Sequence, residues 1–323
     1  MITYPTGWIP PNERTKEQVE IDEKIKAEMI PPFGSVGPVA KPTGEGDEFC
    51  LYRAFGGKQP PYAYQSTGSC VRAGGHNAII TTNQFEIAVN GEAEEFHEFF
   101  TLYSYEVSRW LGGMNSRGDG SFGSTFFKAV VEYGMPRSDY EGLPKPRDQQ
   151  GWRYFPESVE YDWSYNPKFR KEWADEAEEH KVIPVKSFGQ ISSMEELDAA
   201  LTNGYAVTWA SNYGSSDIRE KDGLMVARRN TSWAHQRFCD AVVKRNGTKY
   251  YRFPNSWGPD AHPKPVFDCP AGGFWQTAKE VADDLREPYT EVFAISGVQG
   301  VPARDDGSWE LLEKWWIMMM SGE

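Results

Sequence analysis

The chain has 323 residues, of which 39% are hydrophobic and 25% are charged, a composition typical of a folded globular protein. At about 100–200 residues per domain, this length predicts two domains, or two lobes that share a core. There are 34 Lys and Arg against 47 Asp and Glu, which gives a formal net charge of −13. An acidic chain without a basic run repels phosphate backbones, so we expect no nucleic-acid partner.

Signals for membrane insertion or export are missing from the sequence. No stretch of about 18 or more apolar residues occurs, so no membrane-spanning helix is predicted. The N-terminus has no basic start followed by an apolar run, unlike a secretory signal. The four cysteines, Cys50, Cys70, Cys239 and Cys269, form no CxxC pair. We therefore expect free thiols in a reducing compartment, which indicates a cytoplasmic protein or part of a particle assembled in the cytoplasm.

Residues 1–45 are predicted to form a proline-rich N-terminal arm. Prolines on both sides bracket one charged helical stretch, roughly residues 13–29. Because proline disrupts helix interiors, this helix should be short and its flanks extended. A loosely held tail or a docking arm is the favoured interpretation, since termini are usually loosely held, and a propeptide-like segment is the alternative.

A second helix is predicted to begin near Cys70. Its apolar face consists of Val71, Ala78, Thr82, Phe85 and Val89. Gly74 and Gly75, in its first turns, each cost about 1 kcal/mol relative to alanine. They make sense if another backbone packs closely against this part of the helix.

Two more helices are indicated further along the chain. Residues 124–133 predict a helix that stops at Gly134. Ser193 and Glu196 have the spacing of a capping box and predict the start of another helix.

Strands are predicted mainly in the second half of the chain. Residues 205–210 (YAVTWA) are typical of a strand, and in residues 238–254 two β-prone runs flank Asn246-Gly247, the preferred pair for a type I′ hairpin. Residues 145–185 are assigned as irregular, with a short helix near residues 171–179. Helices in the first half and strands in the second indicate an α+β fold with a helical lobe and a sheet lobe.

Cys70, His235 and Asn255 stand at positions suited to nucleophilic chemistry. Cys70 follows the loop of residues 66–69 and opens a predicted helix, where the positive end of the helix dipole favours the thiolate. His235 lies just before the hairpin and Asn255 just after it. A perfect hairpin register pairs Asn255 with Phe238, an offset of roughly 10 Å from His235, so contact requires a bend before Phe238.

Three segments, in this order, resemble the signatures of the papain family of cysteine peptidases. They are residues 65–70 (QSTGSC), 232–235 (SWAH) and 254–258 (PNSWG). The last is the most specific, because Asn-Ser-Trp-Gly matches the family signature outright. Weaker similarity extends over roughly residues 60–297.

The resemblance implies an α+β, papain-like fold. A helical lobe would pack against an antiparallel β-sheet or barrel lobe, with the active-site cleft between them. Residues 46–187 would form the mainly helical lobe with the nucleophile, and residues 188–300 the β-rich lobe with the histidine and the asparagine. Residues 301–323 would form an apolar C-terminal tail.

The resemblance also implies roles for individual residues. Cys70 would be the nucleophile, His235 its ion-pair partner and the proton donor to the leaving amine, and Asn255 would orient the imidazole. Gln65 and the backbone N–H of Cys70 would form the oxyanion hole. Trp257 would cover the bond between His235 and Asn255.

Substrate binding is implied for a glycine-containing loop and for Trp257. The loop residues are Gly118, Asp119, Gly120 and Ser121. An exposed glycine strand can pair with the backbone of a bound peptide, whereas the bland interpretation of these residues is a simple turn.

Some positions depart from the pattern of the family. Gln65 stands one position closer to Cys70 than is usual, and Val71 replaces the tryptophan that commonly follows the nucleophile. The second Trp-Gly after Asn-Ser-Trp-Gly is missing, and residues 259–263 read PDAHP. These departures concern the reach of Gln65 and the substrate pockets more than the nucleophile or the base.

Two functions of different classes follow. The first is a cysteine peptidase, a thiol hydrolase that cleaves a peptide or protein substrate through a Cys-His-Asn triad and an acyl-enzyme thioester, with no cofactor. The second is a papain-like scaffold that serves as a structural or binding component of a larger assembly, with or without residual activity; the arm and the apolar tail motivate it. A metal site at the nearby His and Cys residues is not expected, because their spacing matches no zinc pattern.

Overall fold

The structure, a computed structural model, describes residues 7–29, 48–90, 96–114, 118–166, 181–182, 185 and 188–295. Three predicted features lie outside these residues in whole or in part. They are the rest of the arm (residues 1–6 and 30–45), the short helix near residues 171–179 and the apolar tail of residues 301–323.

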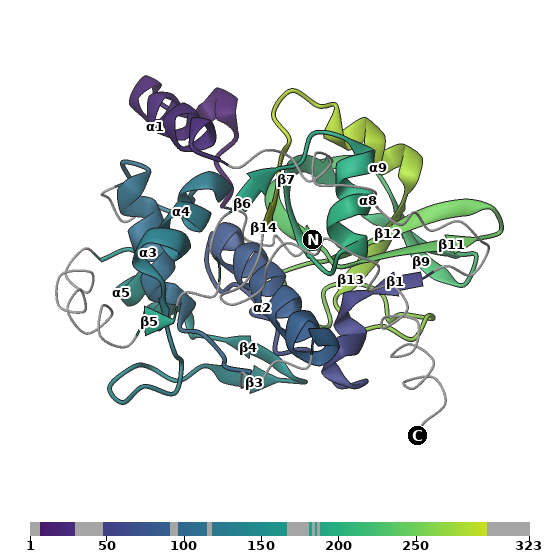
Figure 1. The fold of residues 1–323 in the computed structure, drawn as a ribbon, viewed down its shortest axis with the longest axis horizontal. Coiled ribbons are helices and arrows are strands. Elements are labelled where there is room, and N and C mark those ends of the chain that lie inside the picture. The colour runs from purple at the N-terminus through teal and green to yellow at the C-terminus, as the bar shows by residue number, and fades with distance from the viewer. Residues whose placement is uncertain are drawn as a thin grey trace.

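Helices dominate the first half of the described chain (Figure 1). In chain order, the helices of both halves are η1 (Pro11–Glu13), α1 (Lys16–Ala27), η3 (Leu51–Phe55), α2 (Cys70–Asn90), α3 (Thr101–Leu111), α4 (Gly123–Tyr133), α5 (Glu157–Ser164), α8 (Met194–Thr202) and α9 (Ala278–Leu285).

Most strands belong to two sheets in the second half. Within the described residues, one sheet has the order β1 (Glu48–Cys50), β11 (Ala241–Arg245), β12 (Thr248–Pro254), β13 (Gly273–Thr277), β9 (Leu224–Arg228), β8 (Asp217–Lys221). The other has the order β10 (Thr231–Cys239), β7 (Val207–Gly214), β14 (Glu291–Ile295), β6 (Phe188–Gln190). Two small pairs are β2 (Met135–Pro136) with β5 (Lys181–Val182), and β3 (Arg147–Gln149) with β4 (Trp152–Tyr154). Pairing is antiparallel except between β13 and β9.

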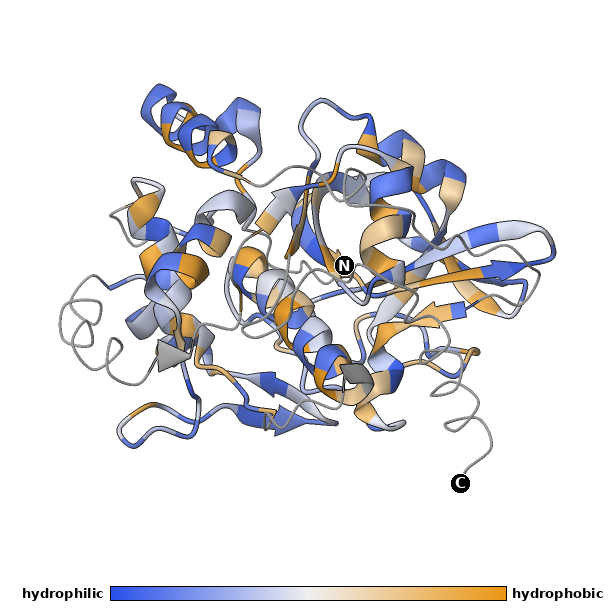
Figure 2. Cartoon of the chain, in the orientation of Figure 1, coloured by the Kyte–Doolittle hydropathy of each residue, from blue (hydrophilic) through white to orange (hydrophobic). Residues whose placement is uncertain are grey.

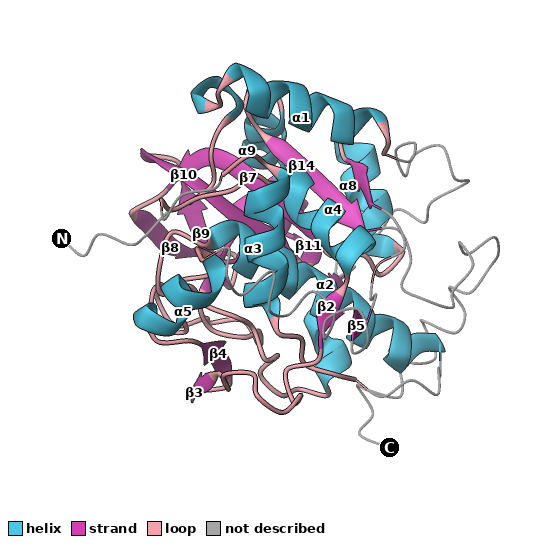
Figure 3. Cartoon of the chain, turned by 90° about the vertical axis from the view of Figure 1, so that its left-hand side faces the viewer, coloured by secondary structure: helices cyan, strands magenta, loops and turns pink. Residues whose placement is uncertain are grey.

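Helix α2 lies between helices α3, α4 and α5 and the two larger sheets. In Figure 1, α3, α4 and α5 are on one side of α2 and the two sheets on the other. Figure 3 shows α3 and α4 in front of strands β7, β10 and β14. This is the α+β, two-lobed arrangement that the sequence predicts.

Aromatic side chains form the core between the lobes. Phe127 of α4 stacks on Phe188 of β6 with ring centroids 5.4 Å apart, and meets Phe293 of β14 edge-on at 6.2 Å. Burying one such side chain stabilises the fold by about 1.5–3 kcal/mol. The contact fixes the helical elements against the sheet that carries β10.

The predicted helices are confirmed where they are described. α2 begins at Cys70 and α4 ends at Tyr133, with Gly134 as its C-cap. In α8, Ser193 and Glu196 make both hydrogen bonds of a capping box. The local signals that predicted these ends depend only on residues next to them.

The two glycines of α2 have different neighbours. A Cβ on Gly74 would lie 3.1 Å from the carbonyl oxygen of Arg237, so another backbone does pack closely there, as predicted. A Cβ on Gly75 would instead lie 2.4 Å from the ring of Phe126. The expectation of a backbone neighbour is therefore wrong for Gly75, where an aromatic side chain takes the space.

The hairpin around Asn246-Gly247 is confirmed. Arg245 pairs with Thr248, and the two turn residues have φ of +47° and +74°, as a type I′ turn requires. β10 has a register shift with β7 between Ser232 and His235, before Phe238, where the sequence predicts a bend. The chain then leaves β10 at Asp240 to enter the other sheet.

Helix α1 packs on α4 at the edge of the molecule (Figure 1). Figure 2 shows α1 as largely hydrophilic, and only Asp22 and Ile25 of it are buried. None of the helices within the described residues combines the length and apolar character that a bilayer-spanning helix needs.

Candidate active site

Cys70, at the start of α2, is completely buried. α2 packs against β10, and the missing side chain of Gly74 permits this close approach. The backbone N–H of Gln236 in β10 thereby comes within 3.4 Å of Sγ of Cys70 and donates to it. Because Gln236 directly follows His235, the candidate nucleophile and the candidate base lie on segments that touch.

His235 and Asn255 are hydrogen-bonded to each other. Nε2 of His235 lies 2.6 Å from Oδ1 of Asn255, and both side chains are buried. Asn255 directly follows β12, while His235 lies in β10 at a shift in its register with β7. The change of sheet at Asp240 brings together two residues that a straight hairpin would hold apart.

The hydrogen bonds around Asn255 assign the proton of His235. The backbone N–H of Ser256 donates to Oδ1 of Asn255 at 2.7 Å, which identifies that atom as the amide oxygen. Nε2 of His235 must then donate to Oδ1, so the lone pair of the ring is on Nδ1. Nδ1 has no hydrogen-bond partner among the described residues. It is therefore not bonded to Cys70 in this structure, but it is the ring atom able to accept a proton.

Trp257 covers the imidazole of His235. The two rings are stacked, with centroids 4.5 Å apart and an interplanar angle of 27°. Trp233 packs edge-on against Trp257 at 4.9 Å. Trp257 is 9% exposed, so the bond between His235 and Asn255 is shielded from water.

Gln65 lies in the loop before Cys70 and is buried. Its Oε1 accepts from the hydroxyl of Ser256 at 2.6 Å, and its backbone N–H donates to the Ser256 carbonyl at 2.9 Å. Its Nε2 donates to the carbonyl of Thr67 at 2.8 Å. These bonds tie the loop of Cys70 to the segment that carries Asn255.

A buried carboxylate fixes the loop from the other side. Glu160 of α5 accepts from the backbone N–H of Ser66 at 2.8 Å and from Arg72 at 2.8 Å, and the hydroxyl of Ser69 also donates to it. Sequence reasoning missed Glu160, because residues 145–185 carry no local signal that links them to Cys70.

The described part of the arm crosses the loop of residues 118–121. The backbone N–H of Ser121 donates to the carbonyl of Gly7, and that of Ile9 donates to the carbonyl of Ser121, both at 2.9 Å. A Cβ on Gly7 would lie 1.6 Å from the carbonyl oxygen of Gly68, so only glycine fits at this contact. The arm therefore pairs with the loop that the sequence predicts to pair with the backbone of a substrate.

The loop residues have separate environments. The carboxylate of Asp119 accepts from the backbone N–H of Gly68 at 3.1 Å. Gly120, with φ of +103°, lies against the side chain of Ile9, and Gly118 is exposed. Within this loop, Gly120 and Ser121 contact the described part of the arm.

Four charged side chains anchor the arm to the sheet. Arg14 donates to Asp22 at 2.6 Å and to Glu291 of β14 at 3.1 Å, and Lys26 lies 2.7 Å from Asp22 and 2.5 Å from Glu291. The indole N–H of Trp8 also donates to Glu291, at 3.0 Å. Two positive and two negative charges balance, which is the condition for burying them together.

Comparison with known proteins finds relatives in structure alone. No protein-family model and no curated protein matches the chain. The crystal structure of xylellain, a cysteine protease from Xylella fastidiosa, matches with a TM-score of 0.56 and 16% identity over 93% of this chain and 100% of that one. Procathepsin B S9 from Trypanosoma congolense matches with a TM-score of 0.50 and 13% identity over 91% of this chain and 86% of that one. The fold is papain-like.

Burial governs the charge of Cys70 and His235 in this papain-like fold. It raises the pKa of Cys70 to about 12, although backbone N–H groups around the sulfur, including those of Gly7 and Trp8, act to lower it. It lowers the pKa of His235 to about 3, against the effect of the bond to Asn255. Both groups are therefore neutral at pH 7. Burial therefore opposes the thiolate that the position at the start of a helix would favour.

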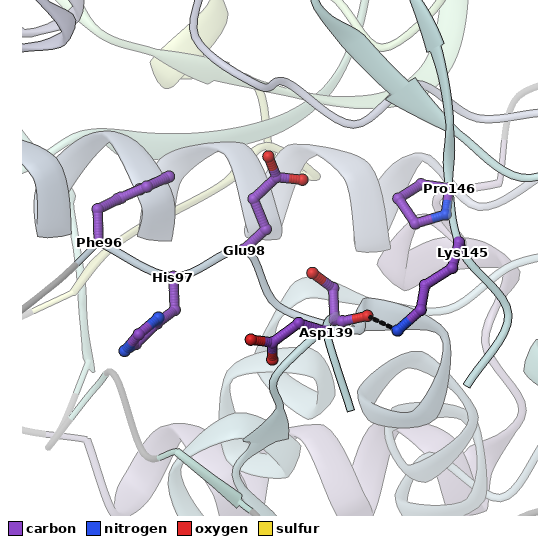
Figure 4. Close-up of a pocket in the computed structure, with 7 residues that line it drawn as sticks. Phe96, His97, Glu98, Asp139, Lys145 and Pro146 are labelled. Carbon is purple, nitrogen blue, oxygen red and sulfur yellow. Dashed lines mark hydrogen bonds between the residues drawn. The ribbon is translucent and has the colours of Figure 1, made fainter. Parts of the chain in front are cut away.

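A pocket of about 480 Å³ lies elsewhere in the papain-like fold (Figure 4). Residues 96–98 and the loop that ends at Pro146 line it, and Lys145 donates to the carbonyl of Ser138 there. None of the predicted site residues lines this pocket. Within the described part of the chain, no cluster of three or more His, Cys, Asp and Glu side chains could hold a metal ion.

Proposed function

We propose that the chain is a cysteine peptidase with Cys70 as nucleophile, His235 as base and Asn255 as the residue that orients the imidazole. The observation that carries this proposal is the 2.6 Å bond between His235 and Asn255 in a papain-like fold, beside a backbone N–H that reaches the Cys70 sulfur. The base then lies between the nucleophile and the orienting group, as in a hydrolytic triad.

The reaction starts with transfer of the Cys70 thiol proton to Nδ1 of His235. The thiolate attacks the peptide carbonyl carbon, and the tetrahedral intermediate expels the amine, which takes the proton from Nδ1. The thioester on Cys70 is then attacked by water, which gives a proton to Nδ1. Return of that proton to the sulfur releases the carboxylic acid and restores the free thiol.

We assign the oxyanion to the backbone N–H of Cys70 and the side-chain amide of Gln65. The hydroxyl of Ser256 donates to Oε1 of Gln65, and the amide nitrogen of Gln65 donates to the carbonyl of Thr67, in the segment before Cys70. One donor of this kind is typically worth about 10²–10³ in rate.

We further propose that this structure is an occluded resting form. Peptides often bind by adding a strand to an exposed edge, and residues 7–9 use the Ser121 edge in this way. The same segment covers Cys70, and burial leaves thiol and imidazole neutral. The arm would then act as a propeptide-like segment.

Hydrolysis of a library of quenched fluorescent peptides tests the peptidase. The Gly7→Val variant, whose arm cannot sit on Gly68, should be the active form. Adding Cys70→Ala to it should lower hydrolysis by at least about 10⁴-fold. Cys269→Ala, which removes a partly exposed thiol, is the matched control and should retain the rate. Equal rates with and without Cys70 would show that the nucleophile is misassigned.

The scaffold function remains the second candidate, and the complete burial of Cys70 favours it. A papain-like component of a larger assembly needs no exposed nucleophile. For a scaffold, light scattering should show association with itself or with a partner. If the scaffold has no residual activity, neither the natural chain nor Gly7→Val should hydrolyse any peptide. All four cysteines are free, so we also propose a reducing, cytoplasmic location.

A further inference from the structure

His262 contacts the candidate triad from outside. Its Nε2 lies 2.9 Å from Nδ2 of Asn255. It belongs to residues 259–263, the segment where the chain departs from the pattern of the papain family. The departure thus places an imidazole against the amide that orients His235.

The direction of this bond follows from the other end of the amide. Because Oδ1 of Asn255 accepts from Ser256, the atom that faces His262 is the amide nitrogen, which donates. Nε2 of His262 must therefore carry a lone pair, with the proton of the ring on Nδ1. A protonated His262 would present an N–H to an N–H and lose the bond.

The surroundings of His262 keep it neutral. Burial lowers the pKa of His262 to about 4, and the charge of Arg237 acts in the same direction. His262 also interacts with His235, which is itself neutral at pH 7. His262 is therefore able to accept a hydrogen bond over the neutral pH range.

The loop around His262 is well fixed. The ring meets Phe274 edge-on at 5.2 Å and lies 6.1 Å from the indole of Trp257. Gly258, with φ of +89°, turns the chain after the Trp257 segment, and Pro263 limits the backbone after His262. The position of the imidazole is set by packing on both sides.

We propose that His262 is a positioning residue, which accepts the side-chain N–H of Asn255 and holds the amide with its oxygen toward His235. This inference rests on the proposed peptidase function. Ser256 fixes one end of the amide and His262 fixes the other, so the amide has one orientation.

The orientation decides which nitrogen of His235 is protonated. With the oxygen of Asn255 toward Nε2, the proton stays on Nε2 and Nδ1 is free to accept the thiol proton of Cys70. An amide turned over would present its own N–H groups to Nε2 and to Ser256. His235 would then carry its proton on Nδ1, the atom that has to receive a proton in the reaction.

Two variants separate hydrogen bonding from packing. His262→Gln keeps an acceptor near the position of Nε2, whereas His262→Phe keeps a ring against Phe274 but cannot accept. His262→Leu is a second non-accepting variant, should the phenylalanine variant not fold. In the Gly7→Val form we expect kcat/KM to fall by about tenfold in the non-accepting variants, through kcat, and by less than about threefold in His262→Gln.

Nitrogen NMR of the histidine rings tests the role of His262 without a measurement of peptidase activity. In the Cys70→Ala protein, and in its His262→Gln form, His235 should hold its proton on Nε2. In the non-accepting variants a measurable fraction should move to Nδ1. Retention of the Nε2 tautomer in every variant would overturn the proposal, as would equal losses in the accepting and non-accepting variants. Absence of peptidase activity would refute the proposed function while the NMR still decides the role of His262.

Discussion

Single residues hold the loop of Cys70 through buried polar contacts. Glu160 is the clearest case, because it pairs with Arg72 while both side chains are 0% exposed, and it also accepts from the backbone of Ser66. A buried ion pair of this kind gives little net stability as a unit, but loss of one partner leaves the other charged and unpaired.

We therefore predict that Glu160→Gln lowers the free energy of unfolding by about 3–5 kcal/mol, because Arg72 keeps its charge without a counterion. The measurement is chemical denaturation followed by fluorescence. The control is Glu157→Gln in the exposed first turn of the same helix, which should change the free energy of unfolding by less than about 0.5 kcal/mol. Equal effects of the two substitutions would contradict this account of the loop.

At the scale of elements, a cluster of charged side chains holds the described arm, together with the buried side chains of Trp8 and Ile25. Burial alone would raise the pKa of Glu291, but Arg14 and Lys26 hold it below its ordinary value of 4.5. Burial would lower the pKa of Lys26, but Glu291 and Asp22 raise it above 10.5. Glu291 thus stabilises docking above pH 4.5 and loses this effect as the pH falls further, while Lys26 loses its effect above pH 10.5.

Docking of the arm should therefore weaken below pH 4.5. Hydrogen exchange followed by mass spectrometry, with peptides from the β11–β12 hairpin as the internal reference, should show faster relative exchange in residues 7–27 as the pH falls through this range. Glu291→Gln should show the faster exchange already at pH 7, with a flatter dependence on pH. Arm protection that is the same in both proteins at every pH would refute the role of the cluster.

The sequence predicts those elements whose signals are local. The start of α2, the capping box of α8 and the turn at Asn246-Gly247 each depend on a few adjacent residues, and all three are confirmed. Helices α3 and α5 were not predicted, since most of their burial depends on neighbours distant in sequence. The sheet change at Asp240 has the same origin, because it depends on which strand β10 finds as its partner.

For the candidate site, the sequence predicts which side chains take part but not how deeply they are buried. The Asn-Ser-Trp-Gly signature singled out Asn255 and Trp257, and both lie at His235. The burial of Cys70 under the arm could not be predicted, because the contact between Gly7 and Gly68 joins distant segments. His262 was equally hidden, since only the fold shows that its loop returns to Asn255.

At the scale of the whole molecule, the arm crosses the loop of residues 118–121, and the thiol of Cys70 is buried in the two-lobed fold. α2 carries Cys70, β10 carries His235 and β14 anchors the arm through Glu291. Access to the sulfur therefore depends on the arm, whereas the His235–Asn255 bond does not. Cys70, the proposed nucleophile, is present but covered.

The rate at which iodoacetamide alkylates Cys70, followed by mass spectrometry at pH 7, tests this claim most directly. Cys269, which is partly exposed and lies outside the site, serves as the reference thiol in the same molecule. We predict slow alkylation of Cys70 in the natural chain and alkylation at least about tenfold faster in Gly7→Val, with the rate of Cys269 unchanged. Equal rates for Cys70 in the two proteins would contradict it.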